Sequence, residues 1–256
     1  MLLVVALFFW ARRAYQQGNK VRRGASFSLV FIGIEALIGA GLVLNELVGD
    51  NDSVLRAVTI AVHLANTFLL LGALTLTAWW ASGGKSFRVR RQGVLGWLVA
   101  IGAVALLVLG MTGAITALGD TLFPAETLQH GLQQDFSGTA HFLIELRIIH
   151  PITAILTGVY LLALALTAVL QRPSVEVRRF SGILLALVFV QLIAGVVNVV
   201  LLAPVWMQIV HLLLADLVWI IFVLFSATTF AVTSAESYIP QQSTPEQPAA
   251  PVQQTT

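Results

Sequence analysis

The segment Phe31-Ile-Gly-Ile-Glu-Ala-Leu-Ile-Gly39 recurs 156 residues later in the chain as Leu187-Val-Phe-Val-Gln-Leu-Ile-Ala-Gly195. At the same offset, the basic pair Arg22-Arg23 corresponds to Arg178-Arg179. An apolar segment that repeats together with its basic flank indicates an internal duplication. We therefore predict two homologous helical halves, related as a parallel repeat.

Histidines extend this repeat. His63-Leu64 lies near the start of one apolar segment, and His211-Leu212 lies near the start of another, 148 residues later. The second half carries a further histidine, His150, and subtracting 156 places its counterpart before Met1. Four intramembrane histidines would indicate a protein with two metal or haem sites, and this chain contains three of the four.

Composition identifies an integral membrane protein. The chain is 58% apolar and only 10% charged, with a mean hydropathy of +0.90. A helix needs roughly 20 apolar residues to cross the hydrocarbon core. Six segments are long enough: 26–48, 55–80, 93–118, 140–170, 179–203 and 206–232. The segment 1–11 has about half this length, and we interpret it as the inner half of a spanning helix whose start is missing. A short interfacial N-terminus is the alternative.

Basic residues define the orientation. Twelve of the fourteen lie in three alternate loops, 12–25, 81–92 and 171–179, which the positive-inside rule assigns to the cytoplasm. We therefore predict a multi-pass protein of the cell membrane with a cytoplasmic C-terminus. The outer segment 119–139 is long enough for a short interfacial helix. The positive charge thus reflects topology and not nucleic-acid binding, and the absence of cysteine excludes disulfides and thiolate ligands.

Ionisable side chains within membrane spans are costly and are therefore functional candidates. His63, His150 and His211 lie at similar depths in the outer half of the bilayer. Imidazole is a common axial ligand of haem iron, so we predict that His150 and His211 bind one haem between their helices. Two separate, hydrogen-bonded histidines are the alternative. His63 alone offers iron one protein ligand, and a purely structural role for it stays open.

The remaining polar residues have less specific interpretations. Arg147 lies three residues before His150 and is predicted to bind a haem propionate, or else to reach the outer headgroups. Glu145 is interpreted as its interfacial partner or a loop residue. His130 and His141 are expected to be solvated loop and boundary histidines, with a transient metal or propionate contact as the alternative. Buried inter-helix hydrogen bonds are expected for a further group, with a proton path as the alternative: Glu35, Gln191 and Asp216.

Several motifs together resemble the haem A synthase family. They are His63-Leu-Ala-Asn-Thr-Phe-Leu-Leu-Leu, Thr112-Gly-Ala-Ile-Thr-Ala-Leu-Gly-Asp-Thr-Leu-Phe-Pro124, His150, and the block from Gln191 to His211. The resemblance covers residues 1 to about 232. It implies an eight-helix fold of two four-helix halves and oxidation of the C8 methyl of haem O to the formyl of haem A, through two hydroxylations and loss of water. By this resemblance, His150 and His211 hold haem b, and His63 belongs to the substrate pair.

The chain departs from the family pattern at its start. The first family helix, the first outer loop and half of the second helix have no counterpart, and neither has the glutamate that the family uses near the substrate. The catalytic residue is therefore unknown, and Glu145 does not match it in position. We divide the chain into a shortened substrate-side half (1–80), a cytoplasmic loop (81–92), a haem b half (93–232) and a disordered tail (233–256).

The resulting expectation is an iron-dependent oxidoreductase of haem A biosynthesis, working in cytochrome oxidase assembly. Its expected partners are haem O, haem A, membrane lipid, haem O synthase and cytochrome oxidase assembly factors, with homo-oligomers left open and no nucleic acid. Two alternatives are a bis-histidine b-type cytochrome that only transfers electrons and a haem-binding oxidase assembly protein.

Overall fold

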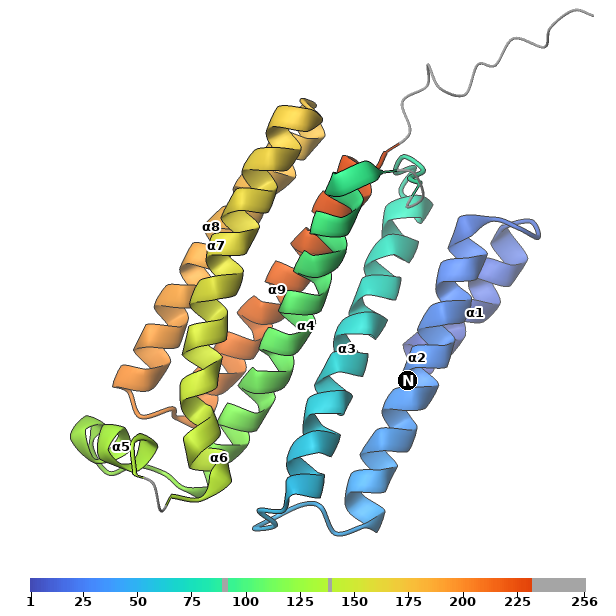
Figure 1. The fold of residues 1–256 in the computed structure, drawn as a ribbon. Coiled ribbons are helices and arrows are strands. Elements are labelled where there is room, and N and C mark those ends of the chain that lie inside the picture. The colour runs from blue at the N-terminus through green and yellow to red at the C-terminus, as the bar shows by residue number, and fades with distance from the viewer. Residues whose placement is uncertain (89–91, 138–139, 232–256) are drawn as a thin grey trace, which may run out of the picture.

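The computed structural model describes residues 1–88, 92–137 and 140–231 as a bundle of long helices (Figure 1). The elements in chain order are α1 (Leu2–Ala14), α2 (Lys20–Leu44), α3 (Val54–Ala81), α4 (Gly93–Leu122), α5 (Leu128–Asp135), α6 (Phe142–Glu145), the 3₁₀ turn η1 (Leu146–Ile148), α7 (Ile149–Gln171), α8 (Val175–Val200) and α9 (Val205–Thr229).

Six of these helical segments are long and apolar enough to cross a membrane, namely α2, α3, α4, the run α6–η1–α7, α8 and α9. They match the six predicted spans, with boundaries that differ by a few residues. The short N-terminal helix is α1, with 13 residues, and the predicted outer helix is α5. The chain is therefore an all-helical, multi-pass membrane protein, as predicted. The proposed disordered tail, 233–256, lies outside the described residues.

Local sequence determines where the helices begin. The side chains of Asn19, Ser53, Thr127 and Ser174 each accept a hydrogen bond from a backbone N–H in the first turn of the following helix. These N–H groups have no partner within the helix, so an oxygen-bearing residue at this position favours helix initiation. Helix α9 starts after Pro204, a residue that does not require a backbone partner for its nitrogen.

Neighbouring helices in the sequence pack against each other, α1 with α2, α2 with α3, α7 with α8 and α8 with α9. The two copies of the repeat are thus equivalent antiparallel pairs, α2–α3 and α8–α9. Helices α3, α4 and α9 contact one another and join the two sides of the bundle (Figure 1). At this junction the rings of Phe68 and Trp219 stack 5.5 Å apart, and Trp219 Nε1 donates a 2.6 Å hydrogen bond to the Phe68 carbonyl oxygen.

The connections α1–α2, α3–α4 and α7–α8, which carry the basic residues, lie at one end of the bundle, the upper end in Figure 1. Two contacts link these connections to each other. Lys85 Nζ lies 3.0 Å from Glu176 Oε1, and Arg172 donates to the Gln92 side-chain oxygen. The three histidines of interest belong to the half of the bundle nearer the opposite end.

Candidate functional site

His150 on α7 and His211 on α9 face each other. Their ring centroids are 6.3 Å apart, and the ring planes are nearly perpendicular at 84°. Metal–imidazole bonds of about 2 Å on either side of an iron, added to the ring radii, give roughly the same centroid separation. The Nδ1 atom of His211 is buried and has no hydrogen-bond partner among the described residues. The pair predicted from sequence is therefore brought together with a spacing that suits one metal ion between the rings.

Helix α4 orients the His150 ring. The hydroxyl of Thr112 lies 3.2 Å from His150 Nδ1 and 3.4 Å from the hydroxyl of Thr153. Histidines that bind metals commonly use their second ring nitrogen for such a contact, because it fixes the ring orientation. Thr112 and Thr153 are thus positioned to hold the imidazole of His150 in one orientation.

Two glycines leave space for the histidine rings. A Cβ atom at Gly113 would lie 3.0 Å from Cε1 of His150, and one at Gly195 would lie 3.2 Å from Cε1 of His211. Side chains at these positions would have to displace the rings. The absence of a side chain at Gly113 therefore leaves space for the ring of a candidate ligand.

Gln191 on α8 contacts the other histidine. Its Nε2 donates to the backbone carbonyl oxygen of His211 at 3.1 Å and lies 3.2 Å from the Nε2 of the ring. The predicted inter-helix hydrogen bond is therefore confirmed, and it connects α8 to the candidate ligand on α9. Each histidine of the pair thus has one polar neighbour on an adjacent helix.

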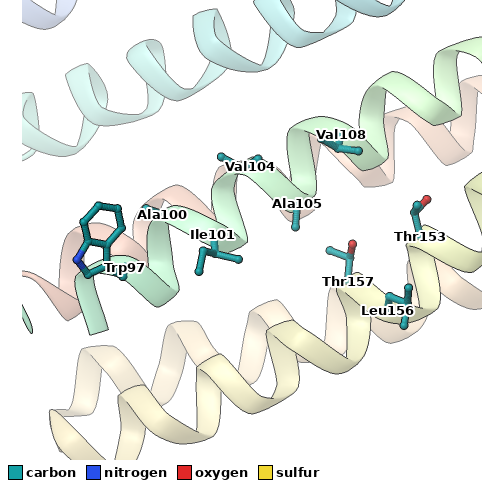
Figure 2. Close-up of a pocket in the computed structure, with 9 residues that line it drawn as sticks. All are labelled: Trp97, Ala100, Ile101, Val104, Ala105, Val108, Thr153, Leu156 and Thr157. Atoms are coloured by element: carbon teal, nitrogen blue, oxygen red, sulfur yellow. The ribbon is translucent and has the colours of Figure 1, made fainter. Parts of the chain in front are cut away.

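An apolar groove of about 470 Å³ lies between α4 and α7 and extends from Thr153, whose hydroxyl donates to the His150 backbone oxygen, to Trp97 (Figure 2). Its lining includes Ile101, Val104 and Leu156, and its side-chain polar atoms are the hydroxyl groups of Thr153 and Thr157 and the ring nitrogen of Trp97. Ile101, Val104 and Leu156 are between 51% and 65% exposed, so this groove faces the lipid side of the bundle. The surroundings of the histidine pair are therefore apolar on this side.

Arg147 lies on η1, at the end of the bundle opposite the basic connections, and only 10% of its side chain is exposed. Its guanidinium is 3.2 Å from the carboxylate of Asp120 and 3.5 Å from that of Asp135. Burial raises the pKa of Asp135, and the nearby Arg147 charge opposes this shift. The predicted ion pair with Glu145 is wrong in this structure, because Asp120 and Asp135 supply the carboxylates and the side chain of Glu145 is exposed. A haem propionate would have to compete with them for Arg147.

His63 lies between α3 and α2 and does not belong to the His150–His211 pair. Its Nε2 is 3.6 Å from Oε1 of Glu35, and its Nδ1 is buried without a partner within the described part of the chain. Glu35 also accepts hydrogen bonds from the Asn66 amide and the Thr67 hydroxyl. The inter-helix hydrogen bonds predicted for Glu35 are therefore confirmed.

The other predicted polar residues have separate environments. His130 is exposed on α5, and His141 caps α6 and lies 3.3 Å from Asp52, in agreement with their predicted boundary positions. Asp216 differs from its prediction, because its buried Oδ1 has no hydrogen-bond partner among the residues described here. It lies on α9 beyond His211, and no inter-helix bond to Oδ1 is present.

Four polar contacts to these histidines and to Glu35 were not predicted, and they are made by Thr112, Thr153, Asn66 and Thr67. A signal for three of them was present, because residues three or four positions apart share one face of a helix. Asn66 and Thr67 follow His63 at those spacings, and Thr153 follows His150 at three. Thr112 is on another helix, and its contact depends on how α4 is rotated against α7.

Comparisons with known proteins identify the family of the chain. The chain is 50% identical over 228 residues to the Protoheme IX farnesyltransferase of one strain of Thermus thermophilus, and 49% identical to that of a second strain of the same species. The matched part is 89% of this chain but only 37% of the length of each relative. No solved structure matches the chain significantly. The sequence profile of the COX15-CtaA family, described as Cytochrome oxidase assembly protein, matches residues 1–223. This confirms the resemblance to the haem A synthase family, and the chain belongs to the COX15-CtaA family of cytochrome oxidase assembly proteins.

Proposed function

We propose that the chain acts in cytochrome oxidase assembly as a haem A synthase-type oxidoreductase, which oxidises the C8 methyl group of haem O to a formyl group. One observation carries this proposal. Two histidines from different helices face each other across 6.3 Å, and each is flanked by a glycine that leaves room for its ring. Family membership supports the role in oxidase assembly.

His150 and His211 would hold a haem b by binding its iron. When bound, such a haem supplies reversible one-electron transfer. Thr112 fixes the orientation of the His150 ring, and Gln191 holds the backbone of His211. The helices α4, α7 and α9 belong to spans that are apolar along most of their length. Arg147 stays a candidate for a propionate contact, in competition with Asp120 and Asp135.

The substrate side is proposed to lie at His63. Haem O is an apolar molecule with a farnesyl tail, and a site between α2 and α3 is accessible from the lipid. His63 would bind the iron of haem O, with Glu35 next to its ring. No described residue is assigned as the catalytic acid or base.

The setting of this activity is the cell membrane, with the C-terminus in the cytoplasm. The basic connections at one end of the bundle support this orientation through the positive-inside rule. Haem O synthase would supply the substrate, and cytochrome oxidase assembly factors would receive haem A. The name of the Thermus relatives describes proteins of which this chain matches only 37% of the length, so we do not propose farnesyl transfer for this chain.

A second function is electron transfer alone. It is favoured by the difference between the two sites, since the His150–His211 pair is present while His63 has no second histidine next to it among the described residues. This alternative requires haem b and no haem A.

Haem extraction distinguishes these functions. The chain is expressed in a host that makes haem O but not haem A, and the extracted haems are identified by mass spectrometry. We expect haem A from the wild type, haem b without haem A from His63→Ala, and neither haem b nor haem A from His211→Ala. Haem b without haem A in the wild type would establish the electron-transfer function, and a wild type without any haem would contradict both.

A further inference from the structure

The two copies of the repeat place different chemistry next to equivalent histidines. Glu35 on α2 and Gln191 on α8 occupy matching positions in the repeated segment, and so do Gly39 and Gly195. Each polar residue contacts the histidine of the next long helix, His63 or His211. One copy therefore places a carboxylate beside its histidine, and the other places a neutral amide.

The two copies also differ in the hydrogen-bond donors next to this polar residue. Oε2 of Glu35 accepts a hydrogen bond from the Asn66 amide, which also donates to the Phe31 carbonyl oxygen at 3.0 Å. Oε1 is within hydrogen-bond distance of the Thr67 hydroxyl. Residues Leu214 and Ala215 stand at the positions of Asn66 and Thr67 in the second copy, and neither side chain can donate. The donors are thus found only in the copy that has the carboxylate.

A carboxylate at position 35 has an unfavourable free energy of transfer into the membrane, and an amide of the same length could replace it. Transfer of an acidic side chain into a membrane helix costs a few kcal/mol, and glutamine has the same length without the charge. Gln191 shows that an amide is compatible with the equivalent helix pair, since it donates to the His211 backbone oxygen and lies 3.2 Å from the ring. Packing alone therefore does not account for the charge of Glu35.

The two oxygens of Glu35 accept hydrogen bonds from different donors, so the carboxylate is fixed from two sides. Its Oε1 lies 3.6 Å from Nε2 of His63, with 18% of the Glu35 side chain and 32% of the His63 side chain exposed. A carboxylate beside a metal-binding imidazole orients the ring and increases its donation to the metal. Greater donation favours the oxidised form of iron and lowers its reduction potential.

We propose that Glu35 is a positioning residue for His63, which orients this imidazole and makes it a stronger ligand for the iron of haem O, whereas Gln191 leaves His211 a neutral ligand. The inference rests on the proposed function, because it takes His63 as the ligand of the substrate. It assigns the difference between the two haem sites to one charged side chain.

The test uses the full chain in lipid nanodiscs, titrated with haem O. The part of the binding that is lost in His63→Ala defines the site at His63. For Glu35→Gln we expect a 10- to 100-fold loss of haem O affinity at this site, the usual effect of removing such a partner, and a positive shift of its midpoint potential. The haem at His150 and His211 should keep its potential.

The matched control is Gln191→Glu, which should shift the potential of the other haem in the negative direction. Thr67→Ala removes one donor and leaves Glu35 in place, so it should give a smaller positive shift at His63, even if Glu35→Gln folds poorly. A purely structural role would change the melting temperature of Glu35→Gln but not the potential.

The outcomes separate the inference from the function on which it rests. If His63→Ala reduces haem O binding but neither Glu35→Gln nor Thr67→Ala changes the affinity or potential, the role of Glu35 is overturned. If His63→Ala leaves haem O binding unchanged, the assignment of His63 as the substrate ligand is overturned, and the role of Glu35 with it.

Discussion

The helix pairs α2–α3 and α8–α9 share a scaffold but differ in the groups that surround their histidines. In α8–α9, His211 faces a second histidine, is contacted by an amide and lies against Gly195. In α2–α3, His63 faces a carboxylate held by two donors, and a Cβ at Gly39 would lie 3.8 Å from its ring. A repeated segment can thus keep its backbone geometry while a few side chains set the chemistry of each copy.

The largest expected effect comes from two arginines at the end of the bundle opposite the basic connections, one on each side of the molecule. Arg147 is enclosed by the carboxylates of Asp120 and Asp135, whereas Arg56, in the first turn of α3, donates to the backbone carbonyl oxygens of Gly49 and Asn51. We expect Arg147→Met to lower the free energy of unfolding by about 3 kcal/mol or more, because it leaves two half-buried carboxylates without a cation.

The matched variant Arg56→Met loses only contacts to neutral groups and should cost about 1 kcal/mol. Unfolding of both variants by denaturant in detergent measures the difference. Titration of Arg147→Met with haem also tests the proposed propionate contact. If Arg147 makes this contact, the variant should bind haem b more weakly, in addition to being less stable. Equal losses of stability in the two variants would contradict the role of the acidic pair.

The glycines give an intermediate effect. A Cβ at Gly195 would lie 3.2 Å from the His211 ring, but a Cβ at Gly39 would be at an ordinary contact distance of 3.8 Å from the His63 ring. We expect Gly195→Ala to cost about 1–3 kcal/mol through overpacking and to lower haem b occupancy. Gly39→Ala should be neutral or slightly stabilising, because alanine favours the helix over glycine.

Haem content per chain and melting temperature, measured for both variants, check this prediction. A normal haem b content in Gly195→Ala would mean that the His211 ring can move without losing its ligand position. The two pairs would then differ less in packing than the structure indicates.

The smallest effect concerns Asp135. Burial raises its pKa above the usual 3.8, so the folded protein holds a proton on this carboxyl group more tightly than the unfolded chain does. Its contribution to stability is present in acid and is lost as the pH rises through the folded-state pKa. We therefore expect Asp135→Asn to raise the melting temperature slightly at pH 7, and this gain to disappear near pH 4. A lower melting temperature at pH 7 would show that the attraction to Arg147 outweighs burial.

Much of the fold could be predicted from sequence, because each spanning helix is long and apolar and because the basic residues lie in alternate loops between these helices. The repeat also placed Glu35 and Gln191 at equivalent positions, and hydrogen bonds were the correct prediction for both. The facing of His150 and His211 followed from their similar depths. These features depend on spacing along one helix or on equivalence between the copies.

Other features depend on the rotation of each helix about its axis and on the path of the connecting segments. The spacing of residues along the sequence does not determine either of these. Arg147 is one example, since its partners Asp120 and Asp135 come from the end of α4 and from α5. Thr112 is another, because its contact with His150 requires a particular face of α4 to meet α7. Asp216, predicted to bond across helices, has a buried Oδ1 without such a bond in the described part of the chain.

The most direct test of the central claim is the reduced-minus-oxidised optical spectrum of the purified chain, compared with His150→Ala, His211→Ala and His63→Ala. We expect a low-spin b-type signal in the wild type that either of the first two substitutions abolishes and that His63→Ala preserves. A signal that survives both His150→Ala and His211→Ala would contradict the assignment of this pair as the haem b ligands.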